Sequence, residues 1–185
     1  MDLANEKAAL RAQMKSRISA MTAEQMQWQS MAACRRMARL DAFINAGTVL
    51  VYAAVKGECD PALLAQTARR MGKRVAYPRC EGNELGLYIG EAGGLVPGAF
   101  GIPEPDAACQ RIDIGEVDFA VIPGVAFDKQ GGRLGRGKGY YDRLLKGAGA
   151  VKASLCFNEQ LVDRVPMEAH DGRMDIIVAE NGIYC

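Results

Sequence analysis

Glycines and cationic side chains alternate through residues 131–143, which read GGRLGRGKGYYDR and are called here the basic loop. Glycine lets backbone N–H groups approach an anion closely, because no Cβ stands in the way. A helix that follows such a loop adds partial positive charge at its N-terminus. Residues of these types in this order are typical of a phosphate-binding site.

The spacing within the basic loop resembles the first part of a P-loop, with Gly132 placed four residues before Gly137 and Lys138. Gly139 stands where a P-loop has Ser or Thr, so the hydroxyl that would bind magnesium is missing. A metal ion would need a carboxylate instead, and Asp142 follows Lys138 by one helical turn. The alternative is a surface loop whose charges are solvated, and the spacing does not decide between the two.

The composition is that of an ordinary globular protein. The 185 residues are 49% hydrophobic and 24% charged, which predicts one domain over residues 1–185. A net charge of +1 argues against a nucleic-acid partner. No apolar run is long enough to span a membrane, and the N-terminus lacks the apolar core of a signal peptide. Six scattered cysteines and one histidine argue against structural zinc and fit a reducing compartment, so we expect a cytoplasmic protein.

Helical periodicity dominates the first forty residues and predicts two helices. An apolar stripe at 3.6-residue spacing marks the first, through Leu3, Leu10, Met14, Ile18 and Met21. Thr22 and Gln25 form a capping-box pattern that predicts the start of the second helix, which we expect to run to about residue 40.

After residue 40, short apolar runs alternate with helical segments. We expect helices at 60–71 and 138–146, and strands at 48–53, 74–78, 85–89, 118–123, 152–157 and 174–179. Alternating strands and helices predict an α/β fold: a three-layer, mostly parallel sheet flanked by helices, Rossmann-like, with two N-terminal helices. Residues 90–116 are rich in Gly, Pro and acid and are predicted to form a long functional loop. The basic loop follows the strand at 118–123, at the sheet edge where ligands usually bind.

Residues outside the basic loop could serve the same site. Lys7 and Arg11 are neighbours on one helix face, and Lys7 falls inside the apolar stripe. Either a buried anion lies near it, or its charge reaches water while its stem packs. Glu58 follows the first expected strand and could contact a ligand or only support the turn before the next helix. Tyr140 and Tyr141 could stack on a heterocycle or pack in the core.

The only histidine, His170, stands beside Asp171 near the last expected strand. No nucleophile elbow accompanies it, so the pattern does not indicate a nucleophilic triad. We interpret Asp171 and Asp175 as carboxylates of a metal site or as residues that order the loop.

Residues 123–142, PGVAFDKQGGRLGRGKGYYD, resemble the signature of the 5-formyltetrahydrofolate cyclo-ligase family. The resemblance covers almost the whole chain, including KAALR at 7–11, GECD at 57–60, GIPEP at 101–105 and HD at 170–171. It implies ATP- and Mg²⁺-dependent conversion of 5-formyltetrahydrofolate to 5,10-methenyltetrahydrofolate, with release of ADP and phosphate, through a phosphorylated formyl intermediate. The expected substrates include polyglutamylated forms, and we expect a monomer.

The resemblance also implies roles for individual residues. Lys7 and Arg11 would hold the ATP phosphates. The nucleotide would be wrapped by Arg133, Leu134, Gly135, Arg136, Gly137, Lys138, Gly139, Tyr140 and Tyr141. The folate would be contacted by Arg11, Glu58, Arg136, Gly137, Lys138, Gly139 and Tyr140. The catalytic residues would be Lys138, Arg136 and Tyr140, and the metal ligands Asp142 and Asp175.

One departure from the family concerns the aromatic partner of the folate. Some relatives have a tryptophan in the long loop, whereas this chain has only Phe100 there and Tyr88 before it. Two other functions also stay open. One is an ATP-dependent step on another pterin-like or thiamine-like amide, and the other is a regulatory protein that binds nucleotide or folate without turnover.

Overall fold

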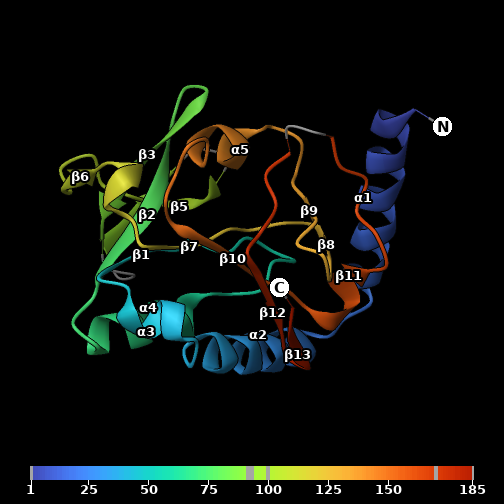
Figure 1. Cartoon of the computed structure of the whole chain (residues 1–185), viewed down its shortest axis with the longest axis horizontal. Coiled ribbons are helices and arrows are strands. Elements are labelled where there is room, and N and C mark those ends of the chain that lie inside the picture. Colours follow the sequence, from blue (N-terminus) through green and yellow to red (C-terminus); the bar gives the residue numbers. More distant parts are fainter. Residues whose placement is uncertain (1, 91–93, 99–100, 169–170, 185) are drawn as a thin grey trace.

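Two long helices open the chain, as predicted, in a computed structural model that describes residues 2–90, 94–98, 101–168 and 171–184 (Figure 1). They are α1 (Leu3–Ser19) and α2 (Ala23–Met37). The predicted capping box starts α2: the Thr22 N–H donates to Gln25 Oε1 at 2.8 Å, and the Gln25 N–H donates to Thr22 Oγ1 at 3.1 Å. The second helix ends earlier than expected, and a short helix α3 (Asp41–Asn45) follows it.

An eight-stranded mixed sheet forms the centre of the fold, in the order β13-β12-β10-β7-β1-β2-β3-β6. Its five parallel strands are β12 (Ile176–Ala179), β10 (Val151–Leu155), β7 (Phe119–Val121), β1 (Thr48–Leu50) and β2 (Arg74–Glu81). Antiparallel strands form the edges: β13 (Gly182–Tyr184), β3 (Glu84–Ile89) and β6 (Arg111–Ile112). This arrangement confirms the predicted mostly parallel sheet, and all six predicted strands lie in it.

Successive residues of the central strands point to opposite faces of the sheet. In β1, Val49 packs with the helices α2, α3 and α4 (Ala62–Arg70), whereas Leu50 packs on the other face. The second face is covered by the short helix α5 (Tyr140–Leu144) together with a small three-stranded sheet. Figure 1 shows α2, α3 and α4 on one side of the molecule and α5 on the other. The three layers are thus present, and a small sheet shares the second face with a single helix.

The small sheet includes residues of the basic loop, and it packs against the core. It consists of β8 (Ala126–Asp128), β9 (Arg133–Leu134) and β11 (Leu161–Val162). The hairpin of β8 and β9 turns at Gly131, whose φ of +84° favours glycine and whose Cβ would lie 2.4 Å from the Met174 carbonyl oxygen. Helix α1 packs on this hairpin through Met14. The first half of the basic loop is therefore fixed structure rather than a solvated surface loop.

The segment 90–116 differs from the prediction of a loop without secondary structure. Its described part contains β4 (Leu95–Pro97), β5 (Pro103–Pro105), the strand β6 and a 3₁₀ turn (Ile114–Glu116). Strands of two or three residues that contain proline carry no alternating apolar pattern, so sequence periodicity does not reveal them. Phe100 lies outside the described residues. In the ranges that are described, no helix is long and apolar enough to cross a membrane.

Candidate active site

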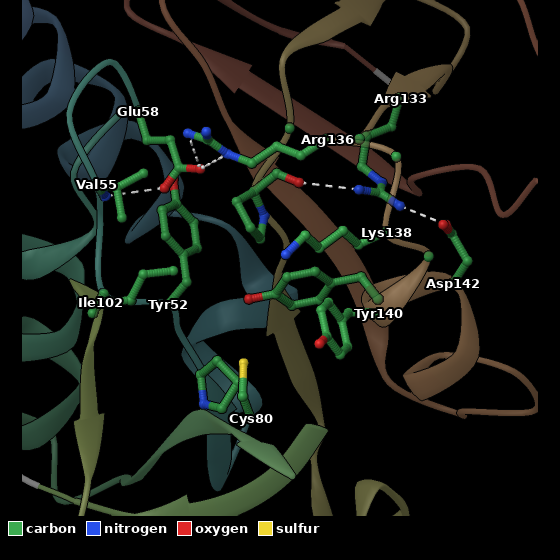
Figure 2. Close-up of a pocket in the computed structure, with 18 of the residues that line it drawn as sticks. Tyr52, Val55, Glu58, Cys80, Ile102, Arg133, Arg136, Lys138, Tyr140 and Asp142 are labelled. Carbon is green, nitrogen blue, oxygen red and sulfur yellow. Dashed lines mark hydrogen bonds and ion pairs between the residues drawn. The ribbon is translucent and has the colours of Figure 1, made fainter. Parts of the chain in front are cut away.

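A cavity of about 510 Å³ lies beside the segments that follow the carboxyl ends of β1 and β7 (Figure 2). This is the edge at which parallel α/β sheets bind ligands. One wall is the basic loop from residues 133 to 142, without Leu134. The opposite wall includes Glu58 after β1 and Cys80 on β2, and Ile102 and Pro103 of the long segment also contribute. The predicted loop residues and Glu58 therefore surround one space.

Glu58 and Arg136 form an ion pair at this cavity. Oε1 of Glu58 lies 2.9 Å from both Nε and Nη2 of Arg136, and Oε2 accepts the Val55 N–H at 3.1 Å. The Glu58 side chain is 10% exposed and that of Arg136 58%. The carboxylate therefore closes the turn from Val55 to Glu58 and also lines the cavity, and its contact with a ligand stays a prediction.

Lys138 extends into the cavity from the basic loop, and Figure 2 shows its ammonium group among the other cavity residues. It is close enough to the Cys80 thiol to act on that group's charge. Tyr140 is oriented by its hydroxyl, which donates to the Gly82 carbonyl oxygen at 2.9 Å, and by the guanidinium of Arg143, 5.2 Å from its ring centroid. The three residues expected to be catalytic, Lys138, Tyr140 and Arg136, thus line one space.

Tyrosine rings supply the aromatic surface of the cavity. Tyr52, Tyr140 and Tyr141 all line it. Tyr52 was not singled out from the sequence; it lies just beyond β1 and donates its hydroxyl to the Cys59 carbonyl oxygen. Burial raises the pKa of the phenols of Tyr52 and Tyr141, so both stay protonated. Tyr88 does not line the cavity and donates instead to Glu81.

Three residues that were expected to contact ATP do not line the cavity. Leu134 is 2% exposed and packs with Met14 and Val165, because β9 turns its side chain into the core; its contact with nucleotide stays a prediction. Arg11 does not line the cavity, but its Nε donates to the Gly135 carbonyl oxygen at 2.9 Å. Arg11 therefore supports the basic loop from α1.

Lys7, the third of these, faces two carboxylates of its own chain. Its Nζ lies 2.7 Å from Asp171 Oδ2 and 3.2 Å from Glu168 Oε1. Burial alone lowers the pKa of Lys7, but these hydrogen bonds and charges outweigh it and the pKa is raised. Asp171 also accepts the Glu168 N–H at 2.8 Å, which fits its interpretation as a loop-ordering carboxylate. His170 lies outside the described residues.

The two carboxylates expected to share a metal ion are not brought together. Asp142 lines the cavity, and its Oδ1 lies 2.5 Å from Arg133 Nη2. Asp175 does not line it; this residue precedes β12 at the amino end of that strand, and its Oδ2 accepts the Lys152 N–H at 2.7 Å. In the described part of the chain, no three His, Cys, Asp or Glu side chains are grouped to hold a metal. Asp175 therefore joins β10 and β12, and its role as a metal ligand stays a prediction.

Cys80 should react slowly with alkylating reagents although it lines the cavity. Burial raises the pKa of its thiol to about 11, and Glu104 adds to the rise. Since the thiolate is the nucleophile, its population at pH 8 should be on the order of 100-fold below that of an ordinary thiol. Peptide mass spectrometry after iodoacetamide treatment measures this, with a free cysteine peptide as reference. Labelling of Cys80 at the reference rate at pH 8 would contradict the expectation.

Comparison with known proteins places this chain among relatives of nearly equal length. The model of the 5-formyltetrahydrofolate cyclo-ligase family matches residues 3–180. The 5-formyltetrahydrofolate cyclo-ligase of Mus musculus is 30% identical over 95% of this chain and 94% of its own, and that of Escherichia coli K12 is 32% identical over 92% and 98%. The NMR structure of Aquifex aeolicus 5,10-methenyltetrahydrofolate synthetase matches with a TM-score of 0.86 at 36% identity, over 96% of this chain and 91% of that one.

Proposed function

The chain belongs to the 5-formyltetrahydrofolate cyclo-ligase family, and from this premise we propose that it closes 5-formyltetrahydrofolate to 5,10-methenyltetrahydrofolate with ATP and Mg²⁺ in the cavity described above. The observation that carries the site assignment is that Lys138, Arg136, Tyr140, Glu58 and Asp142 surround one space. They supply cations for phosphates, a carboxylate for a metal, and polar and aromatic groups for a heterocycle.

The substrate chemistry explains why cations matter more here than a nucleophile. The N5-formyl group resembles an amide, and its carbonyl carbon is a poor electrophile. Transfer of the γ-phosphoryl group to the formyl oxygen, with release of ADP, turns that oxygen into a leaving group. N10 then attacks the formyl carbon and loses its proton to water, the five-membered ring closes, and the C–O bond breaks to release phosphate. Catalysis of phosphoryl transfer is mostly positioning and neutralisation of charge.

The phosphates are proposed to bind along the basic loop. Arg136 and Lys138 reach the cavity with exposed cationic side chains, and the backbone at Gly135, Gly137 and Gly139 leaves room for close approach. Arg136 would leave or share Glu58 when the phosphates arrive, because one guanidinium can bridge two anions through its separate N–H groups. In the loop, Lys138 and Arg136 neutralise the transferred group, and Tyr140 faces the reacting substrate.

The carboxylate of Asp142 fits a magnesium ion that also binds phosphate oxygens. Its Oδ1 is engaged by Arg133, whereas Oδ2 has no hydrogen-bond partner among the described residues. Mg²⁺ typically takes one or two carboxylates, substrate phosphates and several waters, so a single carboxylate in the cavity wall is sufficient. Asp142 would hold the magnesium ion, which would supply positive charge at the phosphates.

Glu58 is proposed to contact the folate, and Glu58→Gln tests this. The charge lost from a carboxylate that is 10% exposed should raise the KM for 5-formyltetrahydrofolate by about 10- to 100-fold. The KM for ATP should change less. Steady-state kinetics with each substrate varied in turn measures both, and Glu84→Gln, an exposed residue of β3, serves as the matched control. An unchanged folate KM would remove Glu58 from the folate site.

The reaction itself is tested by following the absorbance band of the methenyl product. The purified chain is mixed with 5-formyltetrahydrofolate, ATP and Mg²⁺, and compared with the same mixture without ATP. Growth of the band only with ATP is the expected result. No band with measurable ATP binding would favour the alternative of another pterin-like substrate. No band and no ATP binding would contradict the proposal.

We also propose that the protein acts in the cytoplasm. The five cysteines that the structure describes are all free thiols, which suits a reducing compartment. A monomeric state and the use of polyglutamylated substrate stay predictions.

A further inference from the structure

We propose that Arg133 is a positioning residue that acts through Asp142 and does not itself contact the nucleotide phosphates. This differs from the role that the family resemblance implies for it. The inference rests on the proposed function, because it takes Asp142 as the carboxylate at the metal and phosphate end of the cavity. It separates one arginine of the basic loop from the cations that face substrate.

Both terminal nitrogens of the Arg133 guanidinium are bonded to groups of the protein itself. Its Nη1 donates to the Pro123 carbonyl oxygen at 3.1 Å, and its Nη2 lies 2.5 Å from Asp142 Oδ1, as Figure 2 shows. The Nε atom is buried and has no hydrogen-bond partner in the described part of the chain. A buried donor without a partner costs free energy, so the guanidinium is held in this place at the expense of one hydrogen bond.

Burial separates Arg133 from Arg136 and Lys138, the other two cations of the loop that line the cavity. Its side chain is 4% exposed, compared with 58% for Arg136, and Lys138 is an exposed residue. A guanidinium this far from water interacts strongly with a carboxylate beside it, because the surrounding dielectric is low. Asp142 in turn is 37% exposed, and both residues line the cavity. The arginine can thus orient the carboxylate, which is the more exposed of the two and the one open to a metal ion.

Gly135 lies close to the Arg133 guanidinium. A Cβ on Gly135 would lie 3.1 Å from Arg133 Nη1. Gly135 has no positive φ, so space rather than backbone conformation favours glycine there. At Gly124 a Cβ would lie 3.1 Å from Arg133 Cγ, but its closer contact would be the Phe127 ring at 2.5 Å. Gly135 therefore leaves room for the Arg133 side chain, a use distinct from phosphate binding.

A double-mutant cycle on metal binding tests the inference. The variants are Arg133→Met, Asp142→Asn and both together, and Mn²⁺ binding is measured by electron paramagnetic resonance with a non-hydrolysable ATP analogue present. Loss of a residue that orients a metal ligand typically costs about 10- to 100-fold in metal affinity, and we expect this for Arg133→Met in the wild-type background. In the Asp142→Asn background the same change should alter the affinity less than about twofold, because residues that act as a unit are not additive.

Two further measurements distinguish positioning from direct contact and from misfolding. Without metal, Arg133→Met should keep the affinity for the ATP analogue within about twofold, whereas Arg136→Met should lower it. Arg133→Lys, which keeps the charge but not the planar pair of contacts, should recover part of the metal affinity. Thermal unfolding shows whether each variant is folded. If Arg133→Met does not fold, Arg133→Lys takes its place in the cycle. Arg74→Met, which removes an exposed ion pair with Glu116, is the matched control.

The outcomes separate this inference from the proposed function. An equal loss of Mn²⁺ affinity in both backgrounds would show that Arg133 acts independently of Asp142 and would overturn the inference, while the metal site stands. No loss in either background would overturn it as well. Wild-type Mn²⁺ affinity in Asp142→Asn would remove the metal from Asp142, and the proposed metal site and this inference would both fall.

Discussion

Replacement of Lys138 by alanine should lower kcat/KM by about 100- to 1,000-fold, since removal of one preorganised donor from a transition state that develops negative charge has effects of this size. Lys138 extends into the cavity from the basic loop, where both other cavity cations have carboxylate partners: Arg136 is paired with Glu58, and Arg133 with Asp142. The change should affect kcat more than the KM for folate, because the ammonium group acts on the transferred phosphoryl group. ATP-dependent growth of the methenyl band measures the rate.

The fold should survive this change. Lys138 is an exposed residue, and exposed substitutions typically alter the free energy of unfolding by less than about 0.5 kcal/mol. Lys146, an exposed residue on the segment after the basic loop, is the matched control. Lys146→Ala should keep full activity. Turnover of Lys138→Ala at the wild-type rate would remove Lys138 from the mechanism. A loss of activity that follows a loss of thermal stability would mean that the residue is structural.

The central sheet could be predicted because each of its longer strands appears in the sequence as a short apolar run. Runs such as residues 48–53 and 118–123 are apolar throughout, as expected for parallel strands covered on both faces. The small sheet carries no such signal. Its strand β9 consists of Arg133 and Leu134 between glycines, and it exists because β8 and the core beneath it supply the partners. Tertiary packing overrides local propensity in strands this short.

The candidate site shows the same division between local and tertiary information. Residue types and spacing were enough to predict the basic loop, Glu58 and the sheet edge at which they meet. They could not show that Arg133 is buried while Arg136 is exposed, because both are arginines flanked by glycine in one short stretch. Nor could they place Tyr52, whose type is unremarkable beside an apolar strand. These distinctions depend on which elements pack around each side chain.

Asp142→Asn should raise the Mg²⁺ concentration needed for half-maximal activity and lower kcat together, each by about 100-fold. An amide oxygen is a weaker magnesium ligand than a carboxylate, because Mg²⁺ is a hard cation that prefers charged oxygen. The same change removes the anion from a guanidinium that is 4% exposed, so the protein should also lose about 1–3 kcal/mol of stability, the typical worth of a hydrogen bond to a charged group. Activity against Mg²⁺ concentration and thermal unfolding measure the two effects.

The comparison that makes this prediction decisive is Asp175→Asn. Both aspartates follow from the family resemblance as metal ligands, but only Asp142 lines the cavity, whereas Asp175 accepts the Lys152 N–H beside β10. Asp175→Asn should therefore keep the wild-type Mg²⁺ dependence and at most lose some stability where β10 and β12 meet. If instead both variants need the same raised Mg²⁺ concentration for half-maximal activity, the segment before β12 must move to the cavity when ligands bind. If Asp142→Asn keeps the wild-type Mg²⁺ dependence, the metal has no carboxylate ligand from the basic loop.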